Sequence, residues 1–130
     1  MMRLKTLATV LALAPSLLTP TAGHAAAPAG DPVHGQDIYE SRCSACHSID
    51  ANRVGPAHRG VYGRKAGSAP GYAYSPALRA SRVIWTEATL ARWLTNPQAF
   101  IPGSRMGFQV AEAQDRADVI AYLKTQTAKK

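Results

Sequence analysis

Residues 55–76 set the strongest limit on how this chain can fold, because they lack the pattern of a helix or a strand. Eight of these 22 residues are glycine or proline, and the apolar positions show no regular spacing. The stretch predicts a loop of about twenty residues, which is long for a compact domain. A chain of 130 residues is expected to form one domain with a modest core. We therefore expect a large apolar prosthetic group, wrapped by this loop, to supply part of the core.

The first 25 residues have the order of a secretory signal peptide. A short basic region is followed by a 12-residue apolar stretch, Leu7 to Leu18, and then by small residues. We expect cleavage after Ala25 or Ala27, which leaves residues 26–130 as a single domain. The alternative, an uncleaved anchor, is disfavoured because a bilayer span needs about 20 apolar residues. The sequence thus predicts a soluble periplasmic protein with no membrane span.

The predicted mature domain is basic. Two of the 15 basic residues and none of the 8 acidic residues lie in the leader, which leaves a net charge of +5. Nucleic acid is excluded as a partner by the expected compartment and by the lack of a recognition motif. An acidic protein partner fits the charge, although a merely soluble charged surface explains it equally well.

Three segments have helical features. The first opens with Asp31 as N-cap and Pro32 at the first helical position, and it runs towards Cys46. The second begins near residue 86 and stops before Pro97, and the third covers about residues 111–125. Because no strand is predicted anywhere, the expected fold class is all-α.

The residues that carry chemistry are Cys43-Ser44-Ala45-Cys46-His47. Two cysteines separated by two residues and followed by histidine form the attachment signature of c-type haem. This spacing lets both sulfurs reach the vinyl groups on one porphyrin edge while the histidine faces the iron. We predict one haem c, bound covalently through Cys43 and Cys46, with His47 as an axial ligand.

Three other interpretations of the motif compete with haem attachment. A redox-active dithiol has the same spacing but normally lies in a βαβ context that this chain lacks. A zinc site would need two further ligands, which His34 and His58 do not supply at the usual spacing. A structural disulfide would not need the adjacent histidine. Export and that histidine favour haem over these alternatives.

Met106 is the predicted sixth ligand of the iron. It is the only methionine outside the leader, and it follows a glycine-bearing turn. Its thioether is a soft ligand, so a His/Met pair raises the reduction potential of the iron. His34 and His58 are the rival ligands, and we expect both to lie at the surface.

From about Gly30 to Lys124 the chain resembles a class I cytochrome c of the mitochondrial or cytochrome c2 type. This family has a small all-α fold with three to five helices and long loops wrapped around one covalently bound haem. Besides the haem motif, the stretches that carry the resemblance are Arg53–Pro56, Gly63–Lys65, Pro70–Ser75, Asn96–Met106 and Arg116–Leu123.

The resemblance implies roles for individual residues. The carbonyl of Pro56 accepts the second ring N–H of His47, and the first and last helices cross at Gly35. Three side chains are implied to hydrogen-bond or neutralise the haem propionates: Arg64, Tyr74 and Trp85. The complete predicted pocket consists of Cys43, Cys46, His47, Pro56, Arg64, Tyr74, Ser75, Trp85, Trp93, Ser104, Met106 and Phe108.

The chain also departs from the family pattern. Trp93 stands where a tyrosine is usual, and Leu78 stands where an asparagine often holds an internal water. These two changes predict a drier pocket on the Met106 side. Gln98 and Ala99 replace basic residues near the exposed haem edge, although the basic residues Arg42 and Arg105 remain there.

These features predict a monomeric electron carrier rather than an enzyme. It would shuttle single electrons between acidic-surfaced redox proteins that dock transiently, either a membrane cytochrome complex or oxidase or an exported dehydrogenase. The loss of two basic residues at the haem edge predicts weaker electrostatic steering than in the mitochondrial type. The alternative is a peroxidase-like or gas-sensing haem protein with a labile sixth ligand, which no distal acid–base pair supports.

Overall fold

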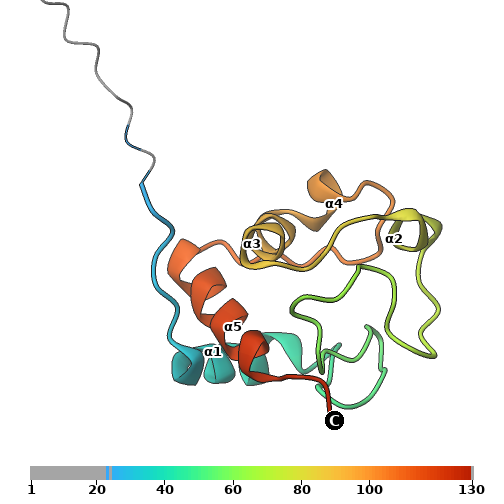
Figure 1. Ribbon diagram of the computed structural model, residues 1–130, viewed down its shortest axis with the longest axis horizontal. Coiled ribbons are helices and arrows are strands. Elements are labelled where there is room, and N and C mark those ends of the chain that lie inside the picture. The colour runs from blue at the N-terminus through green and yellow to red at the C-terminus, as the bar shows by residue number, and fades with distance from the viewer. Residues whose placement is uncertain (1–22, 24, 130) are drawn as a thin grey trace, which may run out of the picture.

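The computed structural model describes residue 23 and residues 25–129. The predicted signal peptide therefore lies almost wholly outside the described residues. The described helices are connected by long loops (Figure 1), and the sole β-bridge of this part joins Lys65 to Ile84. The elements are α1 (Pro32–Ile38), the π-helix η1 (Tyr39–Cys43), α2 (Pro76–Ala80), α3 (Glu87–Thr95), α4 (Pro97–Phe100) and α5 (Ala113–Thr125).

Helix α1 begins as predicted. The carboxylate of Asp31 accepts hydrogen bonds from the backbone N–H groups of Val33 and His34, and Pro32 occupies the first turn. The helix then widens into η1 and ends at Cys43, three residues earlier than the predicted approach to Cys46. The segment turns there because the backbone N–H groups of Cys46 and His47 both donate to the carbonyl of Cys43, at 3.1 and 2.9 Å.

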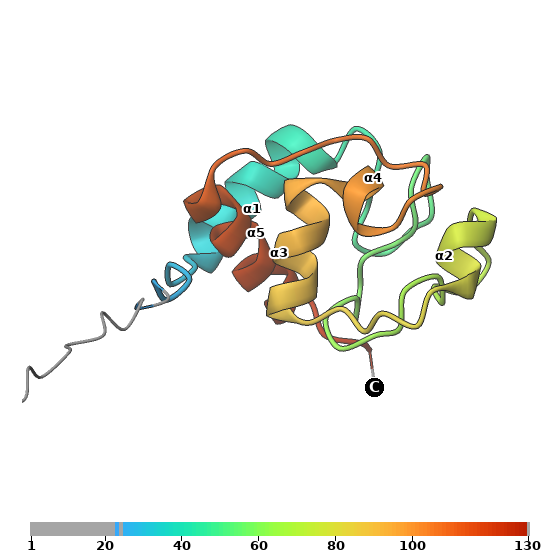
Figure 2. The same cartoon turned by 90° about the horizontal axis from the view of Figure 1, so that it is seen from above.

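Helices α1 and α5 cross at Gly35, as the family resemblance implied. A Cβ atom at this position would lie 1.9 Å from the backbone oxygen of Asp118, so only glycine allows the two backbones this close. Figures 1 and 2 show α5 lying across α1 near the start of the described domain. The contact joins the first and last helices of the described residues.

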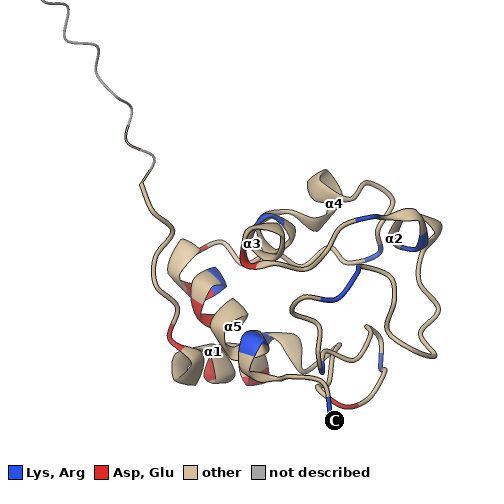
Figure 3. Ribbon diagram, in the orientation of Figure 1, with Lys and Arg blue, Asp and Glu red and all other residues tan. Residues whose placement is uncertain are grey.

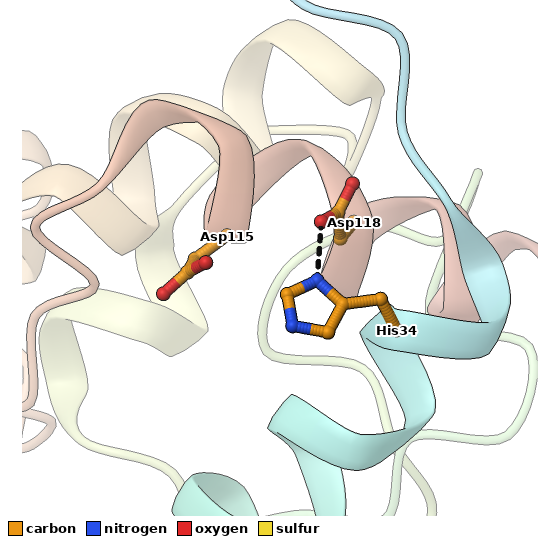
Figure 4. Close-up of side chains that lie close together, drawn as sticks. All are labelled: His34, Asp115 and Asp118. Carbon is orange, nitrogen blue, oxygen red and sulfur yellow. Dashed lines mark hydrogen bonds and ion pairs between the residues drawn. The ribbon is translucent and has the colours of Figure 1, made fainter.

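Asp118 of α5 forms the polar contacts between the two crossing helices. Its side chain is only 2 % exposed, and it accepts hydrogen bonds from the backbone N–H of Asp31, from Nδ1 of His34 and from the Gln114 amide. Figure 4 shows His34 reaching from α1 to Asp118, with Asp115 one turn away on α5. Burial alone would raise the pKa of Asp118, but these hydrogen bonds outweigh it and lower the pKa.

Helix α3 packs against α5 and closes one side of the core. Thr86 and Thr89 cap its start reciprocally, and the helix ends at Thr95, so the prediction of a start near residue 86 and a stop before Pro97 is confirmed. Its buried residues Leu90 and Leu94 belong to the same core as those of α5.

Two short helices were not predicted. In α2 and α4 a proline occupies the first turn, and the preceding Ser75 or Asn96 accepts a backbone N–H with its side chain. Both starts were visible in the sequence, but helices of five and four residues are too short to show apolar periodicity.

Backbone contacts with neighbouring segments hold the long loop in place, as we expect for a loop of this length. The backbone N–H of Gly63 donates to the carbonyl of Trp85 at 2.6 Å, and the N–H of Trp85 donates to the carbonyl of Arg64 at 2.9 Å. Gly67 has φ +72°, and a Cβ there would lie 2.3 Å from the carbonyl oxygen of Leu78. Buried loop residues such as Val61 and Ala66 therefore face inwards and complete the core.

The His34–Asp118 pair makes the stability of the crossing depend on pH. The hydrogen bond with Asp118 raises the pKa of His34 above its ordinary value of 6.5. The protonated imidazole therefore stabilises the fold fully below that value, and this contribution is lost as the pH rises through the raised pKa. We predict that His34→Gln, which keeps a hydrogen-bond donor but cannot titrate, removes this decline between about pH 5 and pH 8.

The measurement is the free energy of urea unfolding of both proteins across this pH range. The difference between wild type and His34→Gln cancels titrations elsewhere in the molecule. A difference that does not change with pH would contradict the assignment.

Candidate functional site

Helices α3 and α5, η1 and the long loop enclose a cavity of about 410 Å³. This volume lies within the range of roughly 300–1,000 Å³ that is usual for cofactor and ligand sites. The lining is mostly apolar and aromatic, and it includes eleven of the twelve predicted pocket residues. Ser104 is the exception, because it is buried but does not line the cavity.

The cysteine-histidine motif forms one wall of the cavity. His47 Nδ1 donates to the carbonyl of Pro56 at 2.9 Å, which leaves Nε2 with its lone pair available. Burial lowers the pKa of His47, although the bond to Pro56 opposes that change, and the neutral form is the one that binds a metal. A Cβ at Gly55 would lie 2.2 Å from Cε1 of the imidazole, so glycine is needed beside this ring.

Cys43 and Cys46 also line the cavity. Burial raises the pKa of Cys43 to about 11, whereas a redox-active dithiol depends on a lowered thiol pKa. The candidate metal cluster of the described residues is made of His34, Asp115 and Asp118 and includes neither cysteine. Neither observation supports the dithiol or the zinc interpretation.

A set of polar donors lines another part of the cavity. The half-buried Arg64 donates to the carbonyls of Arg59 and Ala57, but its Nε–H is buried and has no partner among the described residues. Tyr74 accepts from the N–H of Ala69 and keeps its own O–H proton free to donate. An unpaired buried donor on a permanent cation indicates an anionic partner. The carboxylates of a haem would provide one, so these residues fit that group.

Ser75 and Trp85 also line the cavity. The hydroxyl oxygen of Ser75 accepts from the N–H of Leu78 at the start of α2, and its proton remains free for a second bond. No acidic residue occurs between positions 51 and 86, so no carboxylate of this stretch competes for the donors.

Met106 lies on the cavity wall at the end of a braced loop. The side-chain amide of Gln98 donates to the backbone oxygens of Ser104 and Met106, at 2.7 and 2.8 Å, and to the Ser104 hydroxyl. Sequence reasoning treated Gln98 only as a lost basic residue and missed this contact. Ser104 acts on the loop and not on the cavity, because its hydroxyl bonds to Pro97.

Aromatic side chains also line the cavity. The buried indole rings of Trp93 and Trp85 lie 5.4 Å apart, and Leu78 faces the same space. Phe108 also lines the cavity but is 47 % exposed, which places it at the rim.

The two rival histidines lie in different settings. His34 is exposed, as expected, and does not line the cavity. His58 was also expected at the surface, and that expectation is wrong. It is half-buried in the cavity wall, its Nδ1 lies 3.0 Å from the hydroxyl of Tyr39, and its ring stacks on His47 at 4.0 Å. Burial holds the pKa of His58 well below its ordinary value.

Comparison with known proteins identifies relatives of this chain. Residues 32–127 match the family model described as Cytochrome c. Cytochrome c of Sesamum indicum is 43 % identical over 106 residues, covering 78 % of this chain and 96 % of the relative. Cytochrome c2 of Rhodomicrobium vannielii is 47 % identical over 102 residues, covering 75 % and 81 %.

A solved structure supports the same relationship. Cytochrome cH from Methylobacterium extorquens superposes with a TM-score of 0.71 at 42 % identity and covers 74 % of this chain and 99 % of that one. The all-α fold predicted from the sequence is thereby confirmed.

Proposed function

The chain belongs to the cytochrome c family, and from this we propose that it is an exported monohaem carrier whose iron is ligated by His47 and Met106. Family membership means that the protein binds haem c and carries electrons rather than catalysing a reaction. The observation that most strongly supports the proposed ligands is that one cavity is lined by Cys43, Cys46 and His47, by Met106 and by Arg64, whose Nε–H has no partner among the described residues.

Haem c supplies one-electron chemistry by alternating between Fe(III) and Fe(II). Cys43 and Cys46 would hold it through thioether bonds at one porphyrin edge. His47 would offer Nε2 to the iron, and the bond from its Nδ1 to Pro56 fixes both the tautomer and the orientation of the ring. These contacts keep the ligand in place in both oxidation states.

The remaining pocket residues have separate tasks in this proposal. Arg64, Tyr74, Ser75 and Trp85 would donate to the two propionates and neutralise part of their charge. Met106 would supply a sulfur ligand that favours the ferrous state and so raises the potential. The Gln98 amide keeps the Met106 loop fixed, which limits rearrangement when an electron enters or leaves.

The rim of the cavity offers a docking surface for redox partners. Arg42, Arg105 and the exposed side chains of Val54 and Phe108 all line the cavity, and Arg42 also forms an ion pair with Asp115 of α5 at 2.8 Å. Figure 3 shows the acidic residues on or near α1, α5 and the start of α3, with Asp50 as the exception. This distribution leaves the loop side of the molecule basic and fits an acidic-surfaced partner.

We propose that these partners are a membrane cytochrome complex or oxidase, or an exported dehydrogenase, and that the carrier meets them transiently as a periplasmic monomer. The amino-terminal sequence, with its signal-peptide order, supports this location. Among the described residues, no helix is both long and apolar enough to cross a membrane.

The axial ligands can be tested by optical spectroscopy. We predict a low-spin spectrum for the haem-loaded protein, with the weak sulfur-to-iron charge-transfer band in its oxidised form. Met106→Ala should lose this band and become high-spin, because alanine offers no ligand atom. Val54→Ala, at the exposed rim, is the control and should keep the band. A wild-type protein that is high-spin or lacks the band would refute Met106 ligation and favour an open-site sensory or catalytic protein.

The docking surface can be tested with small charged oxidants. We predict that oxidation of the reduced protein by anionic ferricyanide slows as ionic strength rises, since salt screens the basic rim. Replacing Arg42 and Arg105 by Gln should flatten this dependence. Arg92→Gln is the control, because Arg92 lies over the Phe100 ring and does not line the haem cavity. Equal salt dependence in the wild type and the rim variant would contradict the docking surface.

A further inference from the structure

A second histidine lies directly against the proposed iron ligand. The rings of His47 and His58 have centroids 4.0 Å apart and an interplanar angle of 21°, so their faces are stacked. Two residues earlier, the carbonyl of Pro56 receives the Nδ1–H of the same His47 ring. The segment 55–58 therefore contacts the ligand both at its edge and on its face.

The position of His58 is fixed in turn by Tyr39. The Tyr39 hydroxyl and His58 Nδ1 are hydrogen-bonded at 3.0 Å, and the two rings meet edge to face at 5.7 Å. Tyr39 is only 4 % exposed and belongs to η1, the element that ends at Cys43. The pair thus connects the helix that carries the first attachment cysteine to the face of the iron ligand.

Burying a phenol and an imidazole here would cost free energy if either lacked a partner. The hydrogen bond between the Tyr39 hydroxyl and His58 Nδ1 supplies this partner for both groups and so offsets the cost of burying them. An apolar side chain could fill the same space without this requirement, which indicates that the pair does more than pack. A group that contacts a metal ligand can fix the ligand's orientation and tune the electronic state of the metal.

We propose that Tyr39 and His58 are positioning residues that hold the ring of His47 and lower the reduction potential of the iron. This inference rests on the proposed function, because it requires His47 to be an axial ligand. Polar groups next to the site stabilise the ferric state, which carries the extra positive charge, better than apolar groups do. The pair therefore opposes the rise in potential that Met106 would cause.

The test uses the haem-loaded protein and the variants His58→Leu, Tyr39→Phe and the double variant. At a fixed electrode potential near the midpoint, His58→Leu should raise the ratio of reduced to oxidised protein on the order of tenfold, or about 59 mV for one electron. Tyr39→Phe should cause a smaller rise, because His58 stays in place but loses its hydrogen bond. The hyperfine-shifted NMR signals of the His47 ring should move in both single variants.

The double variant distinguishes a positioning role of Tyr39, exerted through His58, from an independent effect of each residue on the potential. Its potential should match that of His58→Leu, so the two effects are not additive. It should also unfold at a higher urea concentration than His58→Leu, because the single variant leaves the Tyr39 hydroxyl buried without a partner. Tyr122→Phe is the matched control, since the Tyr122 ring lies 5.3 Å from Tyr39 while its own hydroxyl makes no bond to His58.

The outcomes separate this inference from the proposed function. Unchanged potentials and unmoved His47 signals in both single variants, with normal low-spin His/Met spectra, would overturn the positioning role and leave the carrier function intact. A wild-type spectrum without His/Met ligation would overturn both. Tyr39→Phe removes one atom only, so it provides the measurement even if His58→Leu fails to incorporate haem.

Discussion

The packing of this molecule depends on a central cavity that its side chains enclose without filling. The cavity has a volume of about 410 Å³. Its apolar lining includes Leu90 and Leu94 of α3 and Val119 and Leu123 of α5. Protein interiors are normally close-packed, and unfilled apolar space lowers stability in proportion to its volume. In a domain with so few helices, the cofactor is therefore both the redox centre and a large part of the core. Covalent attachment keeps that core from being lost.

The remaining contacts follow from this arrangement. The first and last described helices, α1 and α5, cross at Gly35, and Asp118 accepts hydrogen bonds from Asp31 and His34 at that crossing. The long loop is held by backbone bonds to the segment before α3, and it brings Arg64 and His58 to the cavity. The same segments line the cavity and contribute buried apolar residues to the core, so the proposed function depends on the elements that provide stability.

Sequence reasoning succeeded where the signal was local. The cysteine-histidine motif, the Asp31 cap and the stop before Pro97 each depend on neighbouring residues. Met106 lies on the cavity wall, and its ligation of the iron stays a prediction. His58 was misplaced because its burial depends on Tyr39 and His47, which are distant in the sequence. Gln98 was missed for a related reason: an amide carries no periodic signal, and its bonds exist only once the loop folds back on α4.

The most direct test of the cavity's role is to compare hydrogen exchange in the haem-loaded protein with that in a Cys43→Ala/Cys46→Ala variant purified without haem. If the cofactor completes the core, the amides of α3 and α5 around Leu94 and Val119 are strongly protected in the loaded protein and exchange almost freely in the variant. Equal protection and an equally cooperative unfolding transition in both proteins would show that the side chains form the core alone. That result would contradict the dependence of the fold on a filled cavity.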